Sequence, residues 1–147
     1  MKYIFVITLS LTLMSLKVNA SEKFSVEGNT LIYDTENVIN EEAEIVWDDA
    51  ELLASVLLEN QSVRILQLNS AGGDLETAYY MSDLIIDYGL DTNVVGECSS
   101  ACTVLLIAGE RRTVQKGSWV GFHQSSWDAT SMKNWYEYYK ADEGWQD

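Results

Sequence analysis

Apolar and polar residues recur along the chain with two different periods, which predict strands followed by helices. Residues 24–26 and 30–33 are rich in strand-forming side chains and flank a Glu-Gly-Asn turn, so we expect a small hairpin. Residues 50–59 have a helical period that places four leucine and valine side chains on one face: Leu52, Leu53, Val56 and Leu57. Asp48 or Asp49 is the expected N-cap of this helix.

A second strand and helix are predicted between residues 63 and 89. Residues 63–68 form a short β-prone run, and residues 75–88 have a helical spacing that directs five side chains inward: Ala78, Met81, Leu84, Ile85 and Tyr88. Gly89 is a natural C-terminal cap, because glycine adopts the left-handed backbone conformation that ends many helices.

The remaining pattern adds a third unit. Val94 and Val95 begin a strand, whereas the apolar run 101–108 fits either a strand or a helix by its period. Serines before this run and a glycine after it favour a buried helix. Residues 111–114 and 118–122 are predicted to be short strands, and a helical stripe follows them: Met132, Trp135, Tyr136 and Tyr139. The order of elements predicts an α/β fold of βαβ units with a mostly parallel sheet.

The first 20 residues have the pattern of a signal peptide. Lys2 supplies the positive start, residues 4–16 are an uncharged apolar run, and residues 18–20 end in the small-x-Ala pattern that signal peptidase accepts. We therefore expect cleavage after Ala20, a periplasmic or secreted location, and one domain over residues 21–147. The alternative is an uncleaved membrane anchor, although the apolar run is short for a spanning helix.

The formal net charge of −14 narrows the range of partners. Such a charge repels phosphate backbones and anionic lipid, which argues against nucleic-acid binding and leaves membrane contact only to an uncleaved signal segment. We interpret the one acidic cluster as a solvated loop and helix start: Glu41, Glu42, Glu44, Asp48, Asp49 and Glu51.

Two cysteines, Cys98 and Cys102, are spaced four residues apart. In an oxidising compartment such a pair favours a disulfide over free thiols, provided that the two Cα atoms come close enough. Together with a single histidine they are too few for a zinc site, so we expect no metal. Neither glycine-rich nucleotide-binding pattern is present, and we expect no cofactor.

The residues that suggest chemistry follow three of the predicted strands. The turn from Asn69 to Gly73 opens a helix, where backbone N–H groups are unpaired and point outward. The adjacent Gly72 and Gly73 let a ligand approach the backbone closely. This turn is either an oxyanion hole or an ordinary strand-to-helix connection.

Ser99 and Ser100 precede the third helix, and each is either its cap or a nucleophile near the positive end of its dipole. The N–H group of Ala101 would then face a developing oxyanion. His123, the only histidine, follows the last strand and is either structural or a general base. Three strand ends that offer oxyanion donors, a nucleophile and a base meet the requirements of an acyl-transfer site.

These motifs, in this order, resemble the proteolytic subunit of the Clp protease. Residues 68–73 are similar to that family's Asn-Ser-Pro-Gly-Gly turn, residues 99–109 to its serine segment with an Ala-Gly ending, and residues 121–124 to its Ile-His-Gln strand. The resemblance covers residues 63–124. It implies a crotonase-like fold of stacked βαβ units, shortened at its C-terminal end, in an exported branch of the superfamily.

The resemblance also implies a role for each motif. Ser100, rather than Ser99, matches the nucleophile, and His123 matches the base. The oxyanion donors fall on the backbone N–H groups of Gly73 and Ala101, and the supporting turn residues on Asn69 and Gly72. Peptide substrate is expected to bind as an added strand beside the site.

The sequence departs from the family pattern in three places. Ala71 replaces the turn proline, and two cysteines flank the serine, which is atypical of the cytosolic subunits. The family's acid lies several tens of residues beyond its histidine, whereas this chain ends sooner. Three carboxylates follow His123, none at the matching distance, so the acid of the triad stays unassigned: Asp128, Asp142 and Asp147.

Two functions are therefore weighed. The first is an exported Clp-like serine peptidase, acting on extended peptides or proteins, with Ser100 as nucleophile and His123 as base. The second is a non-catalytic peptide-binding module that keeps the fold without a complete triad. Acyl-CoA chemistry, which other crotonase folds perform, fits poorly with export and with the negative charge. A homo-oligomer is an open expectation.

Overall fold

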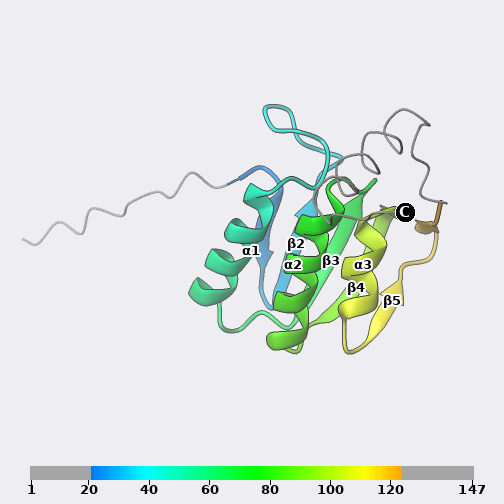
Figure 1. Cartoon of the computed structure of the whole chain (residues 1–147). Helices are drawn as coiled ribbons and strands as arrows, with labels where there is room; N and C mark the ends of the chain where they lie inside the picture. The colour runs from blue at the N-terminus through cyan, green and yellow to red at the C-terminus, as the bar shows by residue number, and fades with distance from the viewer. Residues whose placement is uncertain (1–20, 124–147) are drawn as a thin grey trace, which may run out of the picture.

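The computed structural model describes residues 21–123, which form a mixed sheet with helices packed on one of its faces (Figure 1). The predicted signal segment and the predicted stripe of Met132, Trp135, Tyr136 and Tyr139 lie outside these residues. The described elements, in chain order, are β1 (Phe24–Glu27), β2 (Thr30–Asp34), α1 (Asp48–Glu59), β3 (Ile65–Ser70), α2 (Leu75–Asp87), β4 (Asp91–Ser99), α3 (Cys102–Ala108), β5 (Arg112–Val114) and β6 (Trp119–Gly121).

The six strands described form one sheet in the order β1-β2-β3-β4-β5, and β6 also pairs with β4. β1 and β2 are antiparallel and form the predicted hairpin, whereas the other strand pairs are parallel. Gly28 turns the hairpin with φ 63°, a conformation that glycine adopts without strain. The predicted α/β class and mostly parallel sheet are therefore confirmed.

The core lies between the sheet and the three helices of the described region. Strand side chains alternate, so that Leu66 and Leu68 of β3 are fully buried while their neighbours are half-buried. α2 contributes Ala78, Met81 and Ile85 to the same core, as its helical period predicts. Tyr88 was expected to point inward, but it lies just past α2 and is 38% exposed.

α1 begins differently from the prediction. Its N-cap is Trp47, with no side-chain capping bond, so neither Asp48 nor Asp49 serves that role. Asp49 instead turns into the core, where only 2% of its surface is exposed and its carboxylate pairs with Lys23. The prediction of a wholly solvated acidic cluster is wrong for Asp49, because a buried partner compensates its charge.

β4 changes its partner halfway along, and this change positions the residues that follow it. Its first half pairs with β5, through Thr92 to Val94, and its last three residues pair with β6. Between the two halves the register against β3 shifts, at a bulge where Gly96 has φ 99°. The bulge redirects the end of β4 toward β6.

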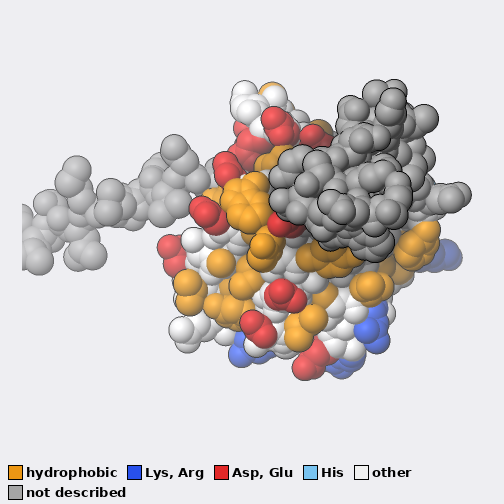
Figure 2. Space-filling view, in the orientation of Figure 1, with side chains coloured by type: hydrophobic (Ala, Val, Ile, Leu, Met, Phe, Trp, Pro, Cys, Tyr) orange, Lys and Arg blue, Asp and Glu red, His pale blue; other side chains and the backbone are white. Residues whose placement is uncertain are grey.

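The helical face carries many exposed apolar side chains (Figure 2). On this face, acidic side chains gather around the loop above α1, while Lys and Arg lie toward the lower and right-hand margins. Among residues 21–123, no helix combines the length and the apolar character needed to cross a membrane.

Candidate functional site

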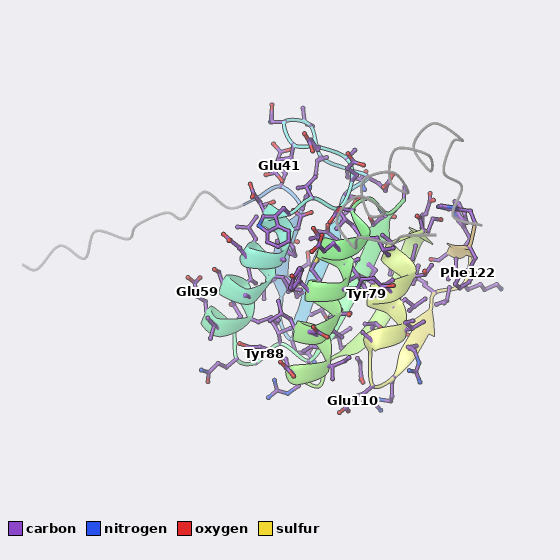
Figure 3. All side chains as sticks on the ribbon, viewed as in Figure 1. Glu41, Glu59, Tyr79, Tyr88, Glu110 and Phe122 are labelled. Atoms are coloured by element: carbon purple, nitrogen blue, oxygen red, sulfur yellow. A yellow bond between two sulfur atoms is a disulfide. The ribbon has the colours of Figure 1, made fainter. Side chains whose placement is uncertain are left out.

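The residues singled out by the sequence meet at the edge of the sheet where β3, β4 and β6 end. In Figure 3 this edge is marked by Glu41, which lies in the loop after β2. It is opposite the edge marked by Tyr88 and Glu110. Loops that leave the carboxyl ends of parallel strands are the usual place for active sites in α/β sheets.

Ser100 lies between β4 and α3 in a left-handed conformation, with φ 54°. It is the one non-glycine residue of the described chain with positive φ. Its N–H donates to the Gly121 carbonyl over 3.0 Å, and its own carbonyl accepts from the Thr103 amide and hydroxyl. Left-handed backbone costs an ordinary residue about 1–2 kcal/mol, and such strain concentrates at functional sites.

His123 reaches Ser100 because of the register of β6. The parallel pairing joins Ser99 to Gly121, and His123 follows two residues later at the same sheet edge. The imidazole Nε2 lies 2.7 Å from the Ser100 Oγ, within hydrogen-bond distance. A serine hydroxyl in contact with an imidazole is the arrangement that nucleophilic catalysis requires.

Ser99 has a different environment from Ser100. Its hydroxyl is buried and has no hydrogen-bond partner within residues 21–123. Gly121 packs directly against it, so closely that a side chain at position 121 would collide with the Ser99 Oγ. The two serines are therefore distinct, and only Ser100 shares a hydrogen bond with His123.

The Gly72-Gly73 turn touches the serine segment. A Cβ atom on Gly72 would lie 2.8 Å from the Ser100 Cβ and 3.1 Å from the Ala101 nitrogen. Both glycines have positive φ, 109° and 143°, which disfavours any other residue there. The turn after β3 thus packs against the turn after β4 without an intervening side chain.

Most N–H groups of the turn are satisfied, contrary to the expectation that they are unpaired. Ala71 donates to the Glu36 carboxylate, Gly72 to the Ser70 hydroxyl, and Asp74 to the Ile45 carbonyl. Within residues 21–123, the N–H group of Gly73 has no acceptor, and the same holds for Ala101. These are the two donors that the resemblance implies for an oxyanion hole.

Asp74 completes the turn as the N-cap of α2. Its carboxylate accepts from the Thr77 hydroxyl over 2.6 Å and from the Thr77 amide over 2.7 Å. These two hydrogen bonds, the side-chain one first, hold the pKa of Asp74 below its usual range. The cap fixes the start of the helix at Leu75, two residues after Gly73.

Asn69 belongs to β3 rather than to the turn, and it supports the β4 bulge. Its side-chain oxygen accepts from the Glu97 amide over 2.9 Å, and its Nδ2 donates to the Asp34 carboxylate. Gly96 approaches this amide so closely that a side chain at position 96 would collide with it. Asn69 therefore supports the serine segment through β4, which the sequence pattern did not reveal.

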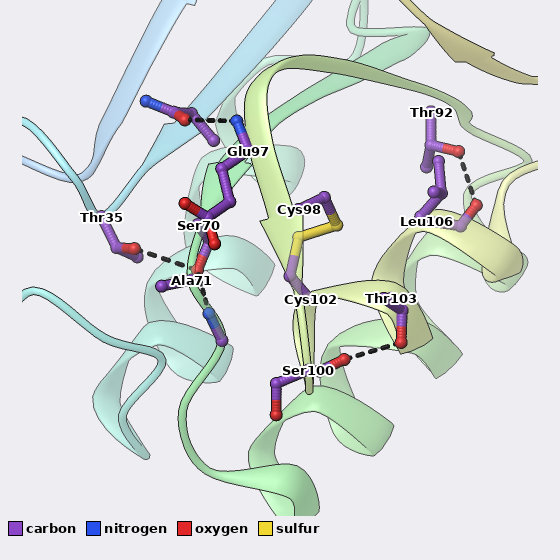
Figure 4. Close-up of a disulfide and its surroundings, with 12 residues drawn as sticks. Thr35, Ser70, Ala71, Thr92, Glu97, Cys98, Ser100, Cys102, Thr103 and Leu106 are labelled. Atoms are coloured by element: carbon purple, nitrogen blue, oxygen red, sulfur yellow. Dashed lines mark hydrogen bonds between the residues drawn. A yellow bond between two sulfur atoms is a disulfide. The ribbon is translucent and has the colours of Figure 1, made fainter. Parts of the chain in front are cut away.

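A disulfide joins Cys98, near the end of β4, to Cys102, the first residue of α3 (Figure 4). The two Cα atoms are 5.3 Å apart, within the range that disulfide closure allows, and both cysteines are fully buried. This confirms the predicted disulfide. The bond spans Ser100 and covalently limits the movement of its backbone.

Two supporting features were not predicted. Ile45, from the loop before α1, forms a parallel bridge with Gly73, and Lys23 forms an ion pair with Asp49 next to that loop. Neither contact has a local sequence signal, because each joins segments that are far apart in the chain.

Asp128, Asp142 and Asp147 lie outside the described residues. Within those residues, no cluster of three or more His, Cys, Asp or Glu side chains is arranged for a metal ion.

Comparison with proteins of known structure identifies the fold of the chain. A mutant of ClpP1 from Listeria monocytogenes matches the structure with a TM-score of 0.53 and 23% sequence identity. The match covers 64% of this chain and 60% of the Listeria chain. No protein-family model and no curated protein sequence matches the chain. The chain has a ClpP-like fold.

Proposed function

We propose that the chain is a serine peptidase of the ClpP-like type, which cleaves extended peptides by acyl transfer through Ser100. The observation that carries this proposal is the 2.7 Å separation between the Ser100 Oγ and the His123 Nε2. It is supported by the strained backbone of Ser100 and by the two N–H groups beside it. The ClpP-like fold agrees with this activity.

In the proposed reaction, the Ser100 Oγ attacks the carbonyl carbon of the scissile peptide bond while the His123 Nε2 accepts the hydroxyl proton. The carbonyl oxygen becomes an oxyanion, which the N–H groups of Gly73 and Ala101 stabilise. The C–N bond then breaks, and the imidazolium gives its proton to the leaving amine. Water hydrolyses the acyl-enzyme by the same route and restores the Ser100 hydroxyl.

We further propose that the protein acts after export, with residues 1–20 removed as a signal peptide. The disulfide between Cys98 and Cys102 supports this location, because disulfides persist in oxidising compartments. N-terminal sequencing of the protein isolated from the periplasm or medium tests it, and a chain that starts at Ser21 is the expected result. The fold also leads us to expect a homo-oligomer, which light scattering measures directly.

Cleavage of unstructured peptides tests the peptidase function. The purified protein, kept oxidised, is incubated with a mixture of extended peptides, and new termini are identified by mass spectrometry. We expect cleavage by the wild type, a loss of at least about 1,000-fold in Ser100→Ala, and little change in Ser99→Ala. Peptides that bind wild type and Ser100→Ala equally well and are never cleaved would instead identify a non-catalytic binding module.

A further inference from the structure

A buried ion pair lies beside the loop that pairs with Gly73. Lys23 and Asp49 have side chains that are only 1% and 2% exposed, and the Lys23 Nζ lies 3.0 and 3.1 Å from the two carboxylate oxygens. The Tyr33 hydroxyl also donates to Asp49, over 2.6 Å. Burial first, and then the negative charge of Asp49, raise the pKa of Tyr33, so this hydroxyl stays a donor.

Both members of the pair also bind the backbone of the loop before α1. The Lys23 Nζ donates to the Glu44 carbonyl over 2.8 Å, and the Val46 amide donates to the Asp49 carboxylate over 3.0 Å. These two backbone groups belong to the residues on either side of Ile45. The ion pair therefore fixes the path of the loop at Ile45 from both directions.

Ile45 in turn holds the glycine turn through its own backbone. Its N–H donates to the Gly72 carbonyl over 2.8 Å, and its carbonyl accepts from the Asp74 amide over 2.9 Å. These two bonds flank Gly73 and orient its peptide groups, and Gly73 packs so tightly on the Ile45 backbone that no side chain fits. The contacts run without interruption from the ion pair to the N–H group of Gly73.

Stability alone does not account for such a pair. Removing two charges from water carries a large desolvation cost, and replacing a buried ion pair with apolar residues of similar volume is often neutral or stabilising. In some proteins, buried polar groups instead select one conformation over others. Here the selected conformation is that of a loop whose backbone sets the position of a proposed oxyanion donor.

We infer that the Lys23–Asp49 ion pair positions the oxyanion turn, acting through Ile45 on the N–H group of Gly73. This inference rests on the proposed function for its catalytic meaning. Lys23 and Asp49 are positioning residues, since their contacts are with Tyr33 and the loop backbone and not with Ser100 or His123.

The test replaces the network with apolar side chains in the full-length protein, as the triple variant Lys23→Met, Asp49→Leu, Tyr33→Phe. Amide hydrogen exchange is measured at Ile45 and Asp74, the two donors that flank Gly73. We expect exchange on the order of tenfold faster at both amides, in a protein that unfolds at a denaturant concentration close to that of the wild type. Tyr33→Phe alone, which leaves the ion pair in place, is the matched control and is expected to exchange like the wild type.

A second readout separates positioning from general structural support. On a cleaved peptide, the triple variant should lose about 10- to 100-fold in kcat with KM unchanged, because an oxyanion donor acts in the transition state. Wild-type exchange at Ile45 and Asp74 in the triple variant would overturn the inference. If the triple variant does not fold, the double variant Lys23→Met, Asp49→Asn, which leaves no unpaired buried charge, takes its place with the same two readouts and the same interpretation.

Failure of the peptidase proposal can be distinguished from failure of the positioning inference. A wild type that cleaves no peptide would contradict the peptidase proposal, while the exchange experiment still decides whether the ion pair orders the turn. Faster exchange with unchanged kcat would show that the turn is ordered by the pair but that Gly73 does not serve the reaction, and this would also overturn the inference.

Discussion

Ser100 and Gly72 depend on each other, because each has an unusual backbone conformation and each occupies space beside the other. Ser100 has φ 54° and Gly72 has φ 109°, and an added Cβ on Gly72 would lie 2.8 Å from the Ser100 Cβ. Gly28 also has positive φ but has open space around it. Substitutions at Gly72 and Gly28 therefore separate the effect of backbone strain from the effect of contact with Ser100.

Gly72→Ala and Gly28→Ala are expected to differ for this reason. Gly28→Ala carries only the strain of a left-handed alanine, about 1 kcal/mol in the free energy of unfolding, and should leave the reactivity of Ser100 unchanged. Gly72→Ala adds a collision with Ser100 and Ala101, so it should cost more and displace the serine. Urea unfolding measures the loss of stability, and the rate at which a fluorophosphonate probe labels Ser100 measures the displacement of the serine. Equal stability and equal labelling rates in both variants would refute the proposed contact.

At the scale of elements, the end of β4 is held by three different connections. The bulge at Gly96 directs it, the Asn69 amide supports the bulge, and the disulfide ties β4 to α3. A seven-residue helix such as α3 gains little stability on its own, so these connections define where it starts.

Removal of the disulfide tests the third connection. The double variant Cys98→Ala, Cys102→Ala should lose about 2 kcal/mol of unfolding free energy, the chain-entropy estimate for so short a loop. We also expect slower labelling of Ser100, because its backbone is no longer held from both sides. A reducing agent should reproduce both effects in the wild type and change nothing further in the double variant; a wild type indifferent to reduction would argue against this role.

The cap of α2 makes a prediction that depends on pH. The lowered pKa of Asp74 means that its contribution to stability is present above the pKa of the unfolded chain, near 4, and is lost as pH falls through the lower folded value. Asp74→Ala should therefore cost about 1 kcal/mol at neutral pH and less in acid. Urea midpoints measured from pH 7 to pH 2 check this, and a cost independent of pH would contradict it.

At the scale of the whole molecule, the sequence predicts the order of elements better than their contacts. The periods of β1, β2 and α2 are local, so their existence could be predicted within a few residues, whereas α3 was indicated by the serines and the glycine that flank its apolar run. The meeting of Ser100 with His123 was also predictable in outline, since carboxyl ends of parallel strands share one edge.

The support of the site could not be predicted in the same way. The β4 bulge, the bridge of Ile45 to Gly73 and the burial of Asp49 each depend on segments that are distant in the chain. The acidic pattern around Asp49 is that of a solvated surface, and only the position of Lys23 across the fold reverses this interpretation. Local periodicity contains no information about such pairings.

The proposed reaction requires Ser100 to be a nucleophile that His123 activates. A fluorophosphonate probe, which loses fluoride when an activated serine oxygen attacks its phosphorus, tests this most directly when the adduct is mapped by mass spectrometry. We predict an adduct on Ser100 in the wild type and in Ser99→Ala, none in Ser100→Ala, and labelling slowed about 100-fold or more in His123→Ala. An adduct on Ser99, or no adduct on Ser100 in either the oxidised or the reduced protein, would contradict the account.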